Sequence, residues 1–172
     1  MALDPPLAQS PDEVRALLAP LRSDFSVAVH QAGNAFAVGA IVRVAHSFLA
    51  REIILVGEAP YYPKASMGME KYERIVTVAD DAALLRHVKG RPLWAVEKER
   101  ARLSVYNVRT FPPGVVFLFG SERFGVPEAL LAAADEIIAI PMYGVNHSFP
   151  VAVAAGIVMH EWARRYFPGR AL

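Results

Sequence analysis

Short apolar runs alternate with helix-like segments along most of this chain, and this alternation constrains its fold more than any other feature. Strands are expected at residues 25–30, 52–56, 75–79, 92–97, 115–119 and 137–140. Helices are expected after the capping box Ser10–Glu13 and at residues 36–49, 80–88, 128–134 and 148–166. Such alternation predicts an α/β protein whose mostly parallel sheet carries helices on both faces. Ligand sites in these folds form beyond the carboxyl ends of strands, so the loops after Phe119 and Ile140 are the first candidates.

Composition sets outer limits on the class of protein. The 172 residues are enough for one domain, residues 1–172, with residues 1–22 as a short N-terminal helical extension. The hydrophobic fraction of 54% is somewhat high, which favours a subunit that hides surface in an oligomer. No apolar run approaches the roughly 18 residues of a membrane span, and no signal peptide is visible. The absence of cysteine excludes disulfides and thiol catalysis and favours a cytoplasmic protein.

Several familiar ligand motifs are incomplete in this sequence. Gly120 and Gly125 have phosphate-loop spacing, but Val126 and Pro127 stand where that loop needs Lys and Ser or Thr. No GxGxxG follows the first strand, so an unrelated nucleotide-binding α/β enzyme is disfavoured. The five histidines do not cluster at metal-ligand spacing, so no metal site is expected. The net charge of +1 neither favours nor excludes RNA, because a local basic patch can suffice.

Three stretches in order resemble one known family. They are NAFAVGAIVRVAHSFLAREIILVG (residues 34–57), VFLFGSERFGVP (residues 116–127) and IPMYGVNHSFPVAVAAGIVMHE (residues 140–161). Together they resemble the TrmH-like branch of the SPOUT methyltransferases, RNA ribose 2′-O-methyltransferases that use S-adenosylmethionine. ASMGMEKYERIV, residues 65–76, is similar to a segment of the tRNA-directed members.

The resemblance implies properties that composition cannot. The fold would be a SPOUT fold with a C-terminal trefoil knot whose loops hold S-adenosylmethionine. Two subunits would form a homodimer through helices that include the last one, which would explain why that helix is apolar nearly all round. The substrate would be tRNA or rRNA.

The resemblance also implies roles for individual residues. Arg43, Glu122 and Ser148 would be catalytic, and Asn34 and Arg43 would contact RNA. The cofactor positions would be Val96, Gly120, Gly125, Ile140, Met142, Ser148 and Phe149. Because arginine keeps its charge at any ordinary pH, Arg43 would stabilise the developing 2′-oxyanion of the ribose.

Each of these residues also has a plainer interpretation. Arg43 could extend from the edge of its helix into water, and Glu122 could be an exposed loop acid. The two glycines could serve turns, Val96 and Ile140 could belong to the core, and Asn34 and Ser148 could cap helices.

The sequence departs from the family pattern at two positions. Ala37 and Pro150 stand where the family carries asparagines. Proline is tolerated in a first helical turn, so Pro150 is compatible with the fold. Either Asn146 or His147 replaces the lost amides, or catalysis is weakened. The alternative function is therefore a SPOUT-fold protein that binds RNA without transferring methyl groups.

Overall fold

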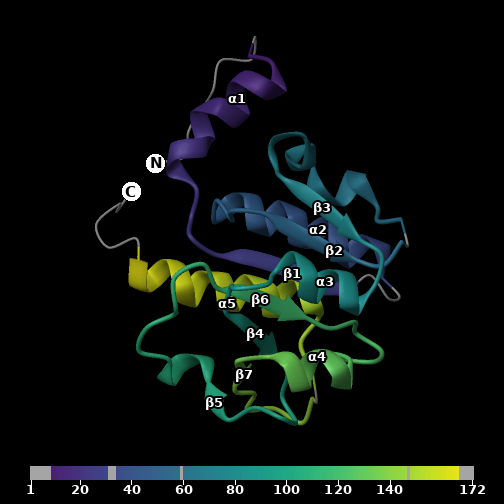
Figure 1. Ribbon diagram of the computed structural model, residues 1–172, viewed down its shortest axis with the longest axis vertical. Helices are drawn as coiled ribbons and strands as arrows, with labels where there is room; N and C mark the ends of the chain where they lie inside the picture. Colours follow the sequence, from purple (N-terminus) through teal and green to yellow (C-terminus); the bar gives the residue numbers. More distant parts are fainter. Residues whose placement is uncertain (1–8, 31–33, 59, 147, 167–172) are drawn as a thin grey trace.

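The described residues form a seven-stranded sheet flanked by helices (Figure 1). A computed structural model describes residues 9–30, 34–58, 60–146 and 148–166 of the chain. The strands are β1 (Ser26–His30), β2 (Ile53–Val56), β3 (Ile75–Val78), β4 (Leu93–Val96), β5 (Leu103–Ser104), β6 (Val116–Phe119) and β7 (Glu136–Ala139). The helices are α1 (Pro11–Leu18), α2 (Ala35–Ser47), α3 (Asp81–His87), α4 (Glu128–Ala133) and α5 (Val151–Tyr166), and the 3-10 segments are η1 (Ala19–Leu21), η2 (Pro63–Ser66), η3 (Met69–Tyr72) and η4 (Val105–Asn107).

All paired strands of the described sheet are parallel, in the order β3-β2-β1-β6-β4-β7-β5. The expected mostly parallel α/β fold is therefore confirmed, and every expected strand is present. Sequence reasoning missed β5, which pairs with β7 at the sheet edge. Its two residues are too few to carry a periodic pattern. The expected start of the last helix at Ser148 is wrong, because α5 begins at Val151.

Two apolar cores cover the two faces of the sheet. Val27 and Val29 of β1 point into one core, which α2 and α5 close. Ala28 lies between them in the strand and points into the other core, against α3 and α4. Because side chains alternate along a strand, each central strand supplies both cores and reads as a continuous apolar run.

The chain returns twice to the interior of the sheet after reaching an edge. β6 enters between β1 and β4, and β7 enters between β4 and β5. α5 then packs against α2 on one face (Figure 1). These returns place the carboxyl ends of β4, β6 and β7 side by side, which is where the candidate site lies. The trefoil knot itself stays a prediction.

The expected capping box opens α1. The Ser10 side chain accepts the Glu13 N–H, and the Glu13 carboxylate accepts the Ser10 N–H at 2.7 Å. Arg15 then donates to the Lys71 carbonyl at 2.9 Å and ties this helix to η3. The sequence signature therefore predicted both the helix and its first residue, Pro11, correctly.

A buried carboxylate joins several strands at the opposite, amino edge of the sheet. Glu52 is 4% exposed and pairs with Arg91, which also donates to Ser26 at the start of β1. The Nε2 atom of His87 lies 3.3 Å from the same carboxylate. Burial opposes ionisation of Glu52, but the hydrogen bonds and charges of Arg91 and His87 lower its pKa below the ordinary value.

We expect Glu52→Gln to lower the free energy of unfolding by about 3 kcal/mol near pH 7, because it leaves Arg91 partly buried without a counter-charge. A lowered pKa means that the stabilising effect of Glu52 is complete above the unfolded-chain pKa of about 4.3. It disappears as the pH falls through the folded-state pKa. Urea unfolding of both proteins across this range checks the prediction, with exposed Glu58→Gln as the control. A difference in the free energy of unfolding between the two proteins that stays constant below about pH 4 would contradict the prediction.

Candidate functional site

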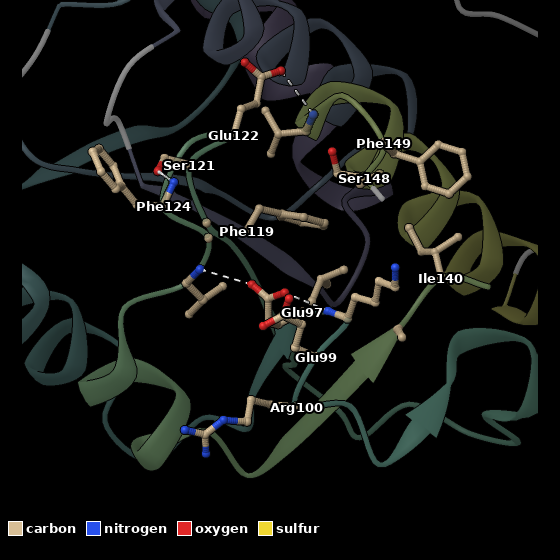
Figure 2. Close-up of a pocket in the computed structure, with 18 of the residues that line it drawn as sticks. Glu97, Glu99, Arg100, Phe119, Ser121, Glu122, Phe124, Ile140, Ser148 and Phe149 are labelled. Carbon is tan, nitrogen blue, oxygen red and sulfur yellow. Dashed lines mark hydrogen bonds between the residues drawn. The ribbon is translucent and has the colours of Figure 1, made fainter. Parts of the chain in front are cut away.

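A cavity of about 840 Å³ opens at the carboxyl edge of the sheet (Figure 2). It is lined by three segments, which follow β4, β6 and β7 and continue into the first turn of α5. Its walls are apolar at Val96, Phe119, Ile140 and Phe149. Charged and polar side chains, among them Glu97, Lys98 and Glu122, line it as well, and a concave site of this size that combines both kinds of wall can hold a small organic ligand.

The loop after β6 closes into a tight turn through its two glycines. Ser121 and Gly125 exchange backbone hydrogen bonds of 3.1 and 2.9 Å, and Gly125 has a positive φ of 65°. A Cβ on Gly120 would lie 2.0 Å from the carbonyl carbon of Gly125 and 2.3 Å from the Val126 nitrogen. Both atoms are backbone, so no side chain fits at Gly120. The glycines therefore serve a turn, as the plainer interpretation expects, and this turn forms a wall of the cavity.

Glu97 links the loop after β4 to this turn. Its carboxylate accepts the Val126 N–H at 3.3 Å and the Lys98 N–H at 2.8 Å (Figure 2). A Cβ on Gly125 would lie 2.7 Å from the Glu97 Oε2 atom. Sequence reasoning missed Glu97. The available signal was its position directly after an apolar strand, where the site-at-the-carboxyl-end rule applies.

Glu122 joins the beginnings of two helices at the rim of the cavity. Its carboxylate accepts the Asn34 side-chain amide at 2.6 Å and the Val151 N–H at 3.4 Å. Asn34 is the N-cap of α2, where its own side-chain oxygen accepts the Ala37 N–H at 3.1 Å. This one carboxylate therefore connects all three sequence stretches that carry the family resemblance.

The segment before α5 lines the cavity instead of continuing the helix. Ser148 lies ahead of α5, so the expectation that it caps this helix is wrong. Its carbonyl accepts the Asn146 side-chain amide at 2.8 Å, and Asn146 also lines the cavity. The Pro150 carbonyl accepts the Val153 and Ala154 N–H groups, which begins the helix. Pro150 donates no bond itself and fits this place. His147 lies outside the described residues.

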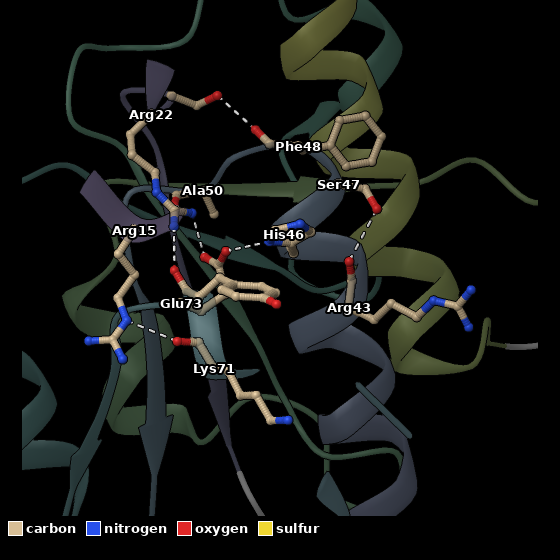
Figure 3. Close-up of polar contacts among 11 residues, drawn as sticks. Arg15, Arg22, Arg43, His46, Ser47, Phe48, Ala50, Lys71 and Glu73 are labelled. Carbon is tan, nitrogen blue, oxygen red and sulfur yellow. Dashed lines mark hydrogen bonds and ion pairs between the residues drawn. The ribbon is translucent and has the colours of Figure 1, made fainter. Parts of the chain in front are cut away.

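The structure gathers nearly all the predicted site residues. All the predicted cofactor positions line the cavity: Val96, Gly120, Gly125, Ile140, Met142, Ser148 and Phe149. Glu122 lines it too, and Asn34 is one hydrogen bond away. Arg43 is the exception. It is exposed on α2, is not among the residues that line the cavity, and extends away from the Glu73–His46 pair (Figure 3).

At both departures from the family pattern, the local backbone N–H group has a hydrogen-bond acceptor. Ala37 is 5% exposed and packs in the first turns of α2, where its N–H is satisfied by Asn34. At the other position, the Val151 N–H that follows Pro150 is satisfied by Glu122. Both Ala37 and Pro150 therefore fit the fold.

This arrangement defines an α/β protein with a ligand pocket built from the loops at the carboxyl edge of its sheet. The model of the SpoU rRNA Methylase family matches residues 24–160, and the chain belongs to that family. No group of three or more potential metal ligands occurs within the described ranges. The helices in those ranges are also too short or too polar to cross a membrane.

Relatives and solved structures agree with this assignment. A tRNA (cytidine(34)-2′-O)-methyltransferase of Beijerinckia indica is 37% identical over 95 residues, which are 50% of this chain and 59% of the relative. The A. aeolicus TrmH/SpoU tRNA modifying enzyme has a TM-score of 0.79 at 25% identity, covering 91% of this chain and 82% of that one. An AdoMet-bound rRNA methyltransferase from Sinorhizobium meliloti has a TM-score of 0.75 at 27% identity, covering 88% and 59%. Matches to curated relatives span 50% to 67% of the relatives' lengths.

Proposed function

We propose that this protein is an RNA ribose 2′-O-methyltransferase that acts on tRNA or rRNA and uses S-adenosylmethionine. The observation that carries the proposal is the junction at Glu122, which joins the α2 cap Asn34 to the first N–H of α5 at the rim of the cavity. The names of the relatives support the same reaction, since they include tRNA and rRNA 2′-O-methyltransferases.

The cavity fits S-adenosylmethionine by its size and chemistry. Val96, Phe119, Ile140 and Phe149 offer apolar walls for a purine ring. Carboxylates of Glu97, Glu99 and Glu122 lie around the same cavity and complement a positively charged sulfonium and ammonium. The cofactor supplies a methyl group activated by the positive sulfur. The AdoMet-bound relative supports this assignment.

The chain's own residues would act on the RNA. A ribose hydroxyl is a weak nucleophile near neutral pH, so negative charge that develops on its oxygen needs a positive partner. Arg43 supplies a permanent charge on the exposed side of α2. Glu122 would position α2 and α5 relative to each other, and Ser148 would line the place where the methyl group is held. RNA lying across the exposed side of α2 would bring the ribose between Arg43 and the cavity.

We also infer that the protein works as a homodimer through α5. Its buried residues, including Val158 and Met159, face the sheet, while Val153 is 47% exposed and adjoins half-buried Ile157. An apolar helix side that faces water in one subunit is typical of an oligomer contact. Light scattering of the purified protein at micromolar concentration tests this, and a monomer mass would refute it.

Two measurements test the proposed function. Calorimetric titration with S-adenosylmethionine should give a micromolar dissociation constant, equivalent to about −8 kcal/mol. Transfer of a radiolabelled methyl group to undermethylated tRNA or rRNA should follow. Binding of both cofactor and RNA without transfer would favour the alternative, a silent RNA-binding protein. Ala37 and Pro150 give that alternative its specific support, because each replaces an amide of the family pattern.

A further inference from the structure

Two aromatic rings lie exposed beside the start of α2. Phe36 is 62% exposed and Tyr62 is 45% exposed, although both are large and partly apolar. Their ring centroids are 6.3 Å apart and their planes differ by 24°, so the rings stack on each other. We refer to Phe36 and Tyr62 as the aromatic ledge. The hydrophobic effect does not explain such exposure, which is typical of a surface that receives a partner.

The backbone beneath the aromatic ledge holds it in place. The Tyr62 N–H donates to the Ala35 carbonyl at 2.9 Å, which ties the loop to the first turn of α2. Gly39 allows this close approach, because a Cβ there would lie 2.4 Å from the Tyr62 carbonyl oxygen and 2.8 Å from the Ala65 Cβ. A fixed helix–loop contact therefore presents the two rings, and ordering this segment on binding costs little conformational entropy.

Cationic side chains accompany the aromatic ledge. Arg43 lies seven residues after Phe36 on α2, which places both on the same exposed side of the helix, about 10 Å apart along its axis. Lys64 is exposed two residues after Tyr62. Within the described ranges, neither charged head has a hydrogen bond or ion pair. Stacked rings next to uncompensated positive charge complement a polymer of bases and phosphates.

The aromatic ledge also lies close to the candidate site. Asn34, two residues before Phe36, donates to Glu122 at the rim of the cavity. Along α2, the aromatic ledge therefore lies between the junction at Glu122 and Arg43.

We propose that the aromatic ledge stacks an unpaired base of the RNA substrate while Arg43 and Lys64 contact its backbone phosphates. This inference rests on the proposed function, because it takes the partner to be RNA. It adds a binding surface outside the cavity and a requirement for unpaired nucleotides, since a base inside a duplex has no free face to stack.

The test uses a single-stranded RNA oligonucleotide that contains the fluorescent base 2-aminopurine, whose emission falls on stacking. The natural protein should quench this emission on binding. Phe36→Leu removes the ring from an exposed position and should weaken binding about tenfold, the equivalent of 1.4 kcal/mol. Phe36→Tyr is the matched control that keeps a ring and should bind like the natural protein. Affinity for S-adenosylmethionine should be unchanged in both variants, because Phe36 does not line the cavity.

Each other outcome overturns the inference. Absence of quenching by the natural protein would show that no base stacks on the protein. Equal binding by Phe36→Leu would show that RNA binds elsewhere. A change in oligomeric state of Phe36→Leu would show that the aromatic ledge is a subunit contact. Methyl transfer by the natural protein is scored separately, so failure of the proposed function is distinguishable from failure of this inference.

Discussion

Arg43→Ala is expected to reduce methyl transfer by a factor of about 100 to 1,000 while leaving the affinity for S-adenosylmethionine within a few-fold. The loss follows from removing the positive charge that would stabilise the developing 2′-oxyanion, and single groups of this kind are typically worth that factor. The cofactor affinity should survive because Arg43 does not line the cavity. Single-turnover methyl transfer and calorimetric titration measure the two quantities independently.

Arg51→Ala is the matched control for this prediction. The Arg51 side chain is 58% exposed, and its nearest carboxylate, that of Asp24, is 3.9 Å away. Its loss should change methyl transfer little, since exposed ion pairs contribute little to the stability of the fold. Unchanged turnover in Arg43→Ala would remove the role assigned to that arginine. Equal losses in both variants would point to a general electrostatic effect on RNA binding instead.

Gly120→Ala is expected to weaken S-adenosylmethionine binding by about 100-fold, or about 2.7 kcal/mol. The added methyl group would meet the backbone of Gly125 and Val126 at 2.0 to 2.3 Å, and backbone cannot move aside as the end of a side chain can. The turn that forms one wall of the cavity must therefore open. Calorimetric titration of the variant measures the affinity.

Gly144→Ala is the control for the glycine prediction. No heavy atom lies within 4 Å of a Cβ at Gly144, so the same chemical change meets open space and should leave binding unchanged. Thermal unfolding of both variants separates loss of the pocket from loss of the fold. Normal cofactor affinity in Gly120→Ala would contradict the assignment of this turn to the cofactor pocket.

The alternation of apolar strands with helices was enough to predict the parallel α/β fold. Buried runs such as Ile53–Val56 and Val116–Phe119 carry this signal because both of their faces are covered. The pattern could not predict the sheet order, in which β6 enters between β1 and β4. Strand order depends on contacts between residues far apart in the chain, and local periodicity contains no information about them.

The candidate site was predictable where it follows from strand ends and from the resemblance. Ile140 and Gly120 lie just after β7 and β6, and both line the cavity as expected. Glu97 was missed because its bond to the Val126 N–H depends on the folded course of the loop. The start of α5 was misplaced because Ser148 is a good N-cap in isolation, yet here its segment is held against the cavity.

The position of Arg43 is the least predictable part of the site. Its place in the sequence implies catalysis, while its position on α2 puts it outside the cavity lining. A helix pattern indicates that Arg43 is exposed but does not say what approaches it. The substrate RNA or a second subunit would therefore complete the surroundings of this side chain.

The most direct test of the central claim is to locate the transferred methyl group on the RNA. The purified protein would be incubated with labelled S-adenosylmethionine and undermethylated RNA, and the product would be hydrolysed in alkali. Cleavage by alkali needs a free ribose 2′-hydroxyl, so a 2′-O-methylated nucleotide stays linked to its neighbour. The proposed function predicts label in alkali-resistant dinucleotides. Label only in mononucleotides, or no label in the RNA, would contradict it.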